Sequence, residues 1–424
     1  MVTSTLADAP VSKAPKVLVP LGVMFLFVGL STSIVGPFVS LFLSTAVKAD
    51  PVHVAAFLVA GPVSMIVSST VIGRLSDRKA VRRQVLAVAA AAGGVSATAT
   101  AFARDYWVLL ALTVTVTAIS GSLFPQAFAY AREALEQRGS TRAAMTISTL
   151  RMLFSIAWVA GPPAAAFLVE LGGFRVLYLS AATMYAAAVL VAVFVLGDVV
   201  PTPKPQREAP EHAPSRVLQV VAALTLLQAA GVLGVQALPL FLSHDLRGSV
   251  RDAGLVLGLC AALEIPLMLG FGALSTRWPL RRLIVIGAGL GVLYYALVTA
   301  SAHTWQIAAA QLVNASFIAA VQGLGISYVQ EMLPGEPGRA ATLAGNAYPI
   351  AAILVGPLFG LAQHFGYRYA YAAATTLCLT GAVLLLTAHR KPQTDRKSQT
   401  DRTPQTDPAP QTDPAPQTDP APQT

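Results

Sequence analysis

The chain has 424 residues, of which 55% are hydrophobic and only 12% are charged, and its mean hydropathy is +0.63. Soluble proteins carry about 25% charged residues, so this composition excludes an ordinary soluble domain and indicates a multi-pass membrane protein. The net charge of +9 would suggest a nucleic-acid partner in a soluble protein. In a membrane protein it reflects the orientation of the loops instead, and we expect no nucleic-acid partner.

Residues 1–16 are polar and lead into a long apolar stretch without a small-residue cleavage site, so we expect a retained first helix. About 20 apolar residues suffice for a helix to cross a bilayer. Twelve segments meet this criterion and lie at about 17–43, 53–73, 84–102, 106–130, 143–169, 174–197, 216–242, 253–275, 282–300, 304–330, 340–363 and 368–388. We therefore expect an all-α membrane fold with twelve transmembrane helices.

Two segments interrupt this pattern. Residues 198–215 are rich in proline and charge, which predicts a cytoplasmic linker between an N-terminal half, 17–197, and a C-terminal half, 216–388. The tail, 389–424, repeats Gln-Thr-Asp every six residues and is almost free of apolar side chains. Such a composition cannot form a packed core, so we expect disorder there and assign it no function.

The lysines and arginines set the orientation. If the N-terminus is cytoplasmic, the inner segments hold 22 of them and the outer segments hold six. Positive charge accumulates on the cytoplasmic side of membrane proteins. The sequence therefore predicts a multi-pass membrane protein with both termini in the cytoplasm.

Arg151 lies inside the membrane segment 143–169, about two turns from the charged edge at Arg142. Helical spacing puts Ser148, Ser155 and Trp158 on the same side as this arginine. A guanidinium in hydrocarbon costs several kcal/mol unless it faces a wet cavity or an acidic partner. This helix should therefore line a polar path through the membrane.

The two halves repeat each other. The run Gly73–Arg83 recurs 199 residues later as Gly272–Arg282, and Gly-Phe174-Arg175 recurs 193 residues later as Gly-Tyr367-Arg368. Further matches occur in the same order, with offsets that drift as small loop deletions would produce. Two parallel six-helix halves are typical of transporters that rock around a site between the halves.

With these features, the chain resembles the major facilitator superfamily over residues 17–388. Gly73, Asp77 and the basic pair Arg82-Arg83 look like the loop motif that follows helix 2 in that superfamily, although Ala80 replaces its usual second glycine. The resemblance implies two pseudo-symmetric six-helix halves and transport by alternating access.

A more specific similarity is to the bacterial sugar efflux transporters. It rests on the segments Phe124–Glu133, Leu150–Pro163, Leu263–Pro266 and Gln311–Asn314. The resemblance implies export of lactose, glucosides, galactosides and their analogues in exchange for protons. The coupling energy would be the proton gradient, with no cofactor, and we expect a monomer.

Glu264 is the second ionisable residue buried in the membrane, at a depth similar to that of Arg151. Because helices 5 and 8 face each other in the superfamily, we expect these two residues to pair. The pair could be a latch between the halves, a proton-coupled switch or a direct ligand for sugar hydroxyls. It could also be a static pair that only neutralises two charges.

Neutral amides and aromatic residues provide a candidate sugar site. Amides donate to and accept from hydroxyls, and an aromatic ring such as that of Trp158 can stack on an apolar sugar face. The candidate residues are Gln126 in helix 4, Gln311, Asn314 and Gln322 in helix 10, and Asn346 and Tyr348 near the start of helix 11. The alternative for each amide is an ordinary hydrogen bond between helices.

Five charged residues at the cytoplasmic surface of the first half form a candidate gate: Asp77, Arg78, Arg132, Glu133 and Arg142. Similar loops in the superfamily pair the aspartate with an arginine of helix 4 and with the start of helix 11. The alternative is simple charge anchoring at the membrane surface. In the second half Thr276 replaces the aspartate, so any such gate is asymmetric.

The sequence contains no metal-ligand spacing, phosphate loop or nucleophile–base pattern, so we expect no enzyme and no metal site. Two rival functions remain. A multidrug/proton antiporter on the same fold would have a cavity richer in aromatic residues than in amides. A non-transporting sugar sensor would signal through its Gln-Thr-Asp tail.

Overall fold

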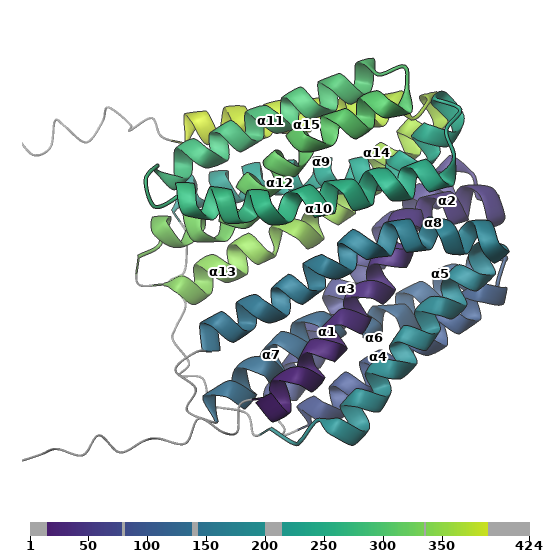
Figure 1. The fold of residues 1–424 in the computed structure, drawn as a ribbon, viewed down its shortest axis with the longest axis vertical. Coiled ribbons are helices and arrows are strands. Elements are labelled where there is room, and N and C mark those ends of the chain that lie inside the picture. The colour runs from purple at the N-terminus through teal and green to yellow at the C-terminus, as the bar shows by residue number, and fades with distance from the viewer. Residues whose placement is uncertain (1–14, 79–80, 138–142, 200–213, 335, 389–424) are drawn as a thin grey trace, which may run out of the picture. The chain divides into compact units, whose positions relative to one another are not determined.

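The computed structural model describes residues 15–78, 81–137, 143–199, 214–334 and 336–388, and within these ranges it is helical without strands (Figure 1). The first half contains α1 (Pro15–Val35), η1 (Gly36–Phe38), α2 (Val39–Leu41), η2 (Phe42–Ala46), α3 (Pro51–Arg78), α4 (Arg82–Phe102), α5 (Tyr106–Leu112), η3 (Thr113–Thr117), α6 (Ala118–Ser120), α7 (Leu123–Glu136), α8 (Ala143–Leu190) and η4 (Val191–Val195). The second half contains α9 (Ser215–Asp245), α10 (Val250–Leu274), α11 (Leu280–Ala300), α12 (Thr304–Met332), α13 (Pro337–Gly345), α14 (Ala347–Phe365) and α15 (Arg368–Thr387). The central linker, the tail and the N-terminal segment fall largely or wholly outside the described residues.

Among the described residues, eleven continuous helical runs are long and apolar enough to cross a membrane. One of them, from Met152 to Val195, has 44 residues, about twice the length that one crossing needs. Gly172 and Gly173 break it, and Gly173 has φ +66°, a conformation that glycine adopts without a steric penalty. This run therefore contains two of the predicted spans, 143–169 and 174–197, so the twelve predicted segments are accounted for.

The sequence repeat is also a repeat of backbone conformation. Lys48 and Arg247, 199 residues apart, both have positive φ, at 60° and 54°. Gly173 and Gly366, 193 residues apart, do so too. Aromatic pairs repeat with the same offsets, because the Phe42 ring lies 5.0 Å from that of Tyr178, and the Phe241 ring lies 4.8 Å from that of Tyr371. The prediction of two pseudo-symmetric halves is confirmed.

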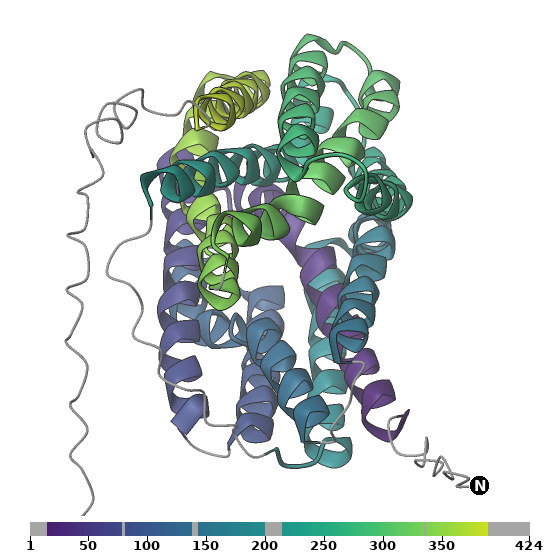
Figure 2. The same ribbon diagram turned by 90° about the vertical axis from the view of Figure 1, so that its left-hand side faces the viewer.

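The halves contact each other through α8 with α10, α3 with α14, and α9 with η1 and α2. Figure 2 shows the second half, teal-green to yellow, above the first half, purple through blue to teal. Glycines permit the closest approaches, since small residues let helix backbones come together in membranes. A Cβ atom on Gly254 of α10 would lie 2.5 Å from the Pro162 carbonyl oxygen, and one on Gly356 of α14 would lie 2.7 Å from the Ala55 carbonyl oxygen.

These contacts lie at one end of the helices, which we call the closed end; it contains Pro51 of α3, Gly254 of α10 and Gly360 of α14. The opposite end, where α7 and α10 terminate, we call the open end. Figure 1 shows that α8 and α10 lie close together at the closed end and farther apart toward the open end.

The exposure of side chains on one face of α14 differs between the two ends. Tyr348, Val355 and Phe359 lie in one direction from the helix axis, because steps of seven and eleven residues return to the same side. Val355 and Phe359, toward the closed end, are 1% and 0% exposed, whereas Tyr348, toward the open end, is 52% exposed. The same face of α14 is therefore buried toward the closed end and uncovered toward the open end.

Candidate substrate and gating site

Glu264 lies on the inward face of α10. The exposed apolar face of this helix, which would contact lipid, carries Leu255, Leu259 and Leu269. At 100° per residue, Glu264 is about 180° around the helix from them. Its carboxylate is half-buried and makes no hydrogen bond or ion pair within the described parts of the chain. A carboxylate at this depth should be functional, because a permanent charge without a partner is costly in a membrane.

The depth of Glu264 matches that of Arg151. The closed-end contacts fix the antiparallel register of α8 and α10, because Gly254 packs on Pro162, and Gly258 packs on the Val159 carbonyl. If this register continues toward the open end, Glu264 is level with a point on α8 within about one turn of Arg151. The Arg151 side chain lies outside what the structure describes, so the predicted pair between the two residues stays a prediction.

A chain of polar side chains joins three helices of the second half next to Glu264. The Gln311 amide donates to the Tyr294 hydroxyl at 3.0 Å, and the Asn314 amide donates to the Gln311 carbonyl oxygen at 2.9 Å and to the Cys260 sulfur at 3.3 Å. Cys260 is one helical turn from Glu264. Asn314 Oδ1 is buried and has no partner among the described residues. A buried acceptor without a partner calls for an explanation, and a substrate hydroxyl would satisfy it.

The other predicted substrate residues occupy different environments. Gln322 and Asn346 are exposed, and Tyr348 faces the uncovered surface of α14 described above. Trp158 is half-buried and lies on the same side of α8 as Pro162, which contacts α10. The substrate roles of these four residues stay predictions.

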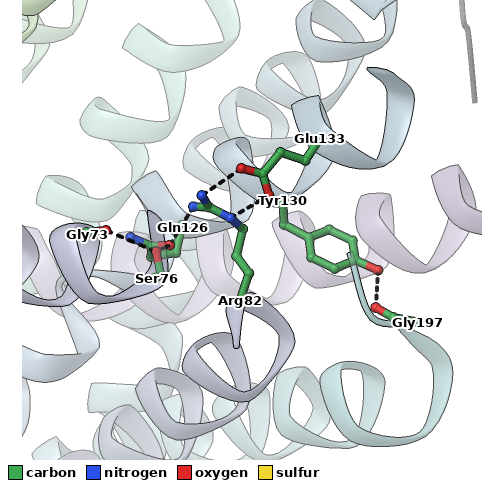
Figure 3. Close-up of polar contacts among 7 residues, drawn as sticks. All are labelled: Gly73, Ser76, Arg82, Gln126, Tyr130, Glu133 and Gly197. Carbon is green, nitrogen blue, oxygen red and sulfur yellow. Dashed lines mark hydrogen bonds and ion pairs between the residues drawn. The ribbon is translucent and has the colours of Figure 1, made fainter. Parts of the chain in front are cut away.

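Gln126 belongs to a different polar cluster, which ties α3, α4 and α7 together (Figure 3). Its carbonyl oxygen accepts from Ser76 Oγ and from Arg82 Nη1, each at 2.9 Å. Arg82 Nη2 donates to Glu133 Oε1 at 2.7 Å, and Arg82 Nε lies 2.7 Å from Glu133 Oε2. The Gln126 oxygen is thus already engaged inside the first half.

The gating residues are described only in part. Glu133 is buried against Arg82, and the Arg132 side chain is exposed. The side chains of Asp77 and Arg78, and the whole of Arg142, lie outside the described residues. The predicted gate is therefore untested.

Arg82 was not among the predicted site residues. Its position in the sequence suggested one of the loop charges that orient the protein, but it is only 2% exposed. The available signal was on the partner helix: Gln126, Tyr130 and Glu133 recur at steps of four and three, so they share one face of α7. Tyr130 extends the same face by donating to the Gly197 carbonyl at 2.8 Å.

Hydrogen bonds also join the two halves at the closed end. Ser40 Oγ of α2 donates to the Gln236 carbonyl oxygen of α9 at 2.6 Å. The Gln236 side-chain amide donates back to the Gly36 carbonyl at 3.2 Å, where η1 interrupts regular α-helix. We call Gly36, Ser40 and Gln236 the closed-end latch. These bonds must break if the closed end is to open.

Aromatic rings gather on the first half. Phe25, Phe124, Phe128 and Phe154, from α1, α7 and α8, have neighbouring ring centroids 4.4–6.0 Å apart. The halves thus differ in chemistry, because amides dominate the polar chain of the second half and phenyl rings dominate this cluster of the first.

Two bundles of six spans, joined at one end, with a carboxylate on an inward-facing surface, define a multi-pass transporter fold. A solved D-xylose–proton symporter has the same fold, with a TM-score of 0.72 at 14% identity, covering 89% of this chain and 98% of that one. The sequence profile described as Major Facilitator Superfamily matches residues 21–234 and 220–416.

Full-length relatives narrow the family. The chain is 33% identical over 371 residues to sugar efflux transporter A of Dickeya chrysanthemi, covering 85% of this chain and 94% of that protein. It is 31% identical over 386 residues to sugar efflux transporter B of Salmonella typhimurium, covering 88% and 98%. The chain therefore belongs to the sugar efflux transporter branch of the Major Facilitator Superfamily.

Proposed function

We propose that the protein exports sugars such as lactose, glucosides, galactosides and their analogues across a bacterial plasma membrane by alternating access, in exchange for protons. The full-length similarity to sugar efflux transporters supports the substrate class. The basic loops support a cytoplasmic location for the open end, in which case this conformation would be the one that receives a cytoplasmic sugar. Both termini would be cytoplasmic, and the monomer would be the working unit.

One observation carries the proton-coupling proposal. Glu264 lies on the face of α10 that turns away from lipid, beyond the contacts of Gly254 and Gly258 with α8, and its carboxylate has no partner among the described residues. A carboxyl group there can take up a proton in one conformation and release it in the other, provided that Arg151 approaches it in only one of them. Proton binding would then alternate with sugar binding.

The sugar would lie between two chemically different walls. Asn314 Oδ1, which is buried and has no partner among the described residues, would accept from a hydroxyl, and Gln322, Asn346 and Tyr348 would contribute from the open-end side. Trp158 would stack on an apolar face of the ring. Gln311 would hold Asn314 in place through their hydrogen bond.

Gating would exchange one set of contacts for another. The closed-end glycine contacts and the closed-end latch hold the present conformation. When they separate, Asp77, Arg78, Arg132 and Arg142 would meet the second half and close the cytoplasmic end. Glu133 would act within the first half, where its pair with Arg82 keeps α4 and α7 together.

Transport into everted membrane vesicles tests the proposal. Wild-type vesicles should accumulate labelled lactose, and a protonophore should abolish the accumulation. Glu264→Gln should still equilibrate lactose but should not concentrate it, because a neutral amide cannot carry the coupling proton. Glu170→Gln changes an exposed glutamate of α8 and is the matched control. Accumulation that survives in Glu264→Gln would remove Glu264 from the coupling path.

The phenylalanine cluster, whose rings meet edge to face, favours a second candidate, a multidrug/proton antiporter, because aromatic ring faces attract lipophilic cations. Vesicles that accumulate such a cation but no sugar would support this alternative. A non-transporting sensor is distinguished by deleting residues 391–424, since a transporter should keep its flux without the tail.

A further inference from the structure

Gln228 of α9 has no part in the site described so far. Its side chain is half-buried, lies in the middle of a membrane-spanning helix and makes no hydrogen bond within the described parts of the chain. The other glutamines of α9 are engaged: Gln219 donates to the Leu384 carbonyl and to the Thr387 hydroxyl of α15, and Gln236 belongs to the closed-end latch. An amide without a partner in this position is costly unless a ligand or water satisfies it.

The neighbours of α9 show which way Gln228 points. Leu224 packs on α12, where its side chain lies 3.5 Å from the Cβ position of Gly325, and Gln236 points at the first half through Gly36. At 100° per residue these two directions are about 120° apart, and Gln228 falls between them, about 40° from Leu224. Leu227, which packs on Gly381 of α15, is about 100° away on the other side. Gln228 therefore faces the space between α12 and the first half.

The same contact sets the depth of Gln228. Helices α9 and α12 run antiparallel, and Leu224 is opposite Gly325. Four residues along α9 from Leu224 is Gln228, and three residues back along α12 from Gly325 is Gln322. The two glutamines are therefore level within about 1.5 Å of axial rise, and right-handed winding turns both to the same side of the helix pair.

Open space lies beside them. Gly231, one turn farther along α9, would meet nothing within 4 Å of an added Cβ atom, and Gln322 is exposed. Two amides at one depth on one side of a helix pair provide two NH2 donor groups and two carbonyl acceptors, which suits adjacent hydroxyls of a sugar and does not suit a lipophilic cation.

We propose that Gln228 is a substrate-binding residue which, together with Gln322, forms an amide clamp on neighbouring hydroxyls of the transported sugar. This inference rests on the proposed function, because it requires a hydroxylated substrate. It adds a specificity element from α9, a helix to which the sequence analysis assigned no substrate contact.

Initial rates of labelled lactose uptake into everted vesicles test the clamp. Gln228→Ala should raise the half-saturating lactose concentration about tenfold with little change in maximal velocity, and Gln228→Asn should recover part of the loss. Gln219→Ala is the matched control on the same helix, because its amide is bound to α15, and it should leave half-saturation unchanged. Rates are normalised to the amount of folded protein recovered by size exclusion.

The double variant Gln228→Ala/Gln322→Ala supplies a readout that a structural role would not move. If both amides bind one substrate, removing the sugar hydroxyl that they contact should weaken uptake by wild type to the level of the double variant. Among lactose analogues that each lack one hydroxyl, at least one should therefore give the same half-saturating concentration in both proteins. Lactose uptake with the same half-saturation in wild type and Gln228→Ala would overturn the clamp and leave the exporter intact. No lactose flux in wild type would overturn the proposed function itself.

Discussion

The closed end can be destabilised by a single methyl group. A Cβ atom on Gly254 would lie 2.5 Å from the Pro162 carbonyl oxygen and 2.6 Å from the Ala166 Cβ. Ordinary contacts begin near 3.4 Å, so Gly254→Ala forces α8 and α10 apart in this conformation. Overpacking of this kind costs about 1–3 kcal/mol, which corresponds to a shift of about 5- to 150-fold in a two-state equilibrium.

The expected result is a redistribution between conformations and not unfolding, because the contact joins the two halves and disappears when the closed end opens. Alanine is also a better helix former than glycine, but that gain of about 1 kcal/mol applies to both conformations and cancels in their ratio. Gly270→Ala on the same helix is the control, since its Cβ would meet nothing within 4 Å.

Distances between spin labels at the open end measure the redistribution. Labels on Gln137 and Glu331, one in each half, should give a second, shorter distance in Gly254→Ala, while Gly270→Ala should retain the wild-type distribution. The native Cys260 and Cys378 are replaced by serine for labelling. An unchanged distribution in Gly254→Ala, or an equal shift in Gly270→Ala, would refute the assignment of the closed end.

Two further variants test the polar contacts. Arg82→Ala leaves the Glu133 carboxylate buried without its partner, so it should lower the free energy of unfolding by about 3–5 kcal/mol, seen as a lower melting temperature in detergent, whereas Arg74→Ala at an exposed site should have little effect. Equal melting temperatures for the two would contradict a stabilising role of the ion pair. Ser40→Ala removes the hydroxyl bond to Gln236 and should shift the spin-label distribution in the same direction as Gly254→Ala, by about 1 kcal/mol; an unshifted distribution would exclude Ser40 from the latch.

The conformation also explains why the candidate site is only partly assembled. At the open end, Gln322 and Tyr348 are exposed, whereas Gln311 and Asn314, toward the closed end, are already linked to Tyr294 and one another. A sugar that enters from the open end would meet exposed amides first and the buried acceptor of Asn314 last. Binding energy could then drive the closure of the open end around the substrate.

The sequence by itself determined the helices, their number and their repeat. A backbone in lipid must satisfy its own hydrogen bonds, so each apolar run of sufficient length must be a helix, and matched residues 199 and 193 apart reappear as matched backbone conformations at Lys48 and Arg247 and at Gly173 and Gly366. The inward direction of Glu264 follows from the same reasoning, because helical periodicity separates it from the leucines that face lipid.

Only the tertiary structure decided which neighbour each face meets. Periodicity gives a side chain a direction about its own helix axis, but it does not say which helix lies in that direction or in what register. Tertiary packing brings Arg82 against Glu133 and Asn314 against Cys260, and the contact of Leu224 with Gly325 sets the register in which Gln228 is level with Gln322. These contacts join residues far apart in the chain, so no local pattern could have specified them.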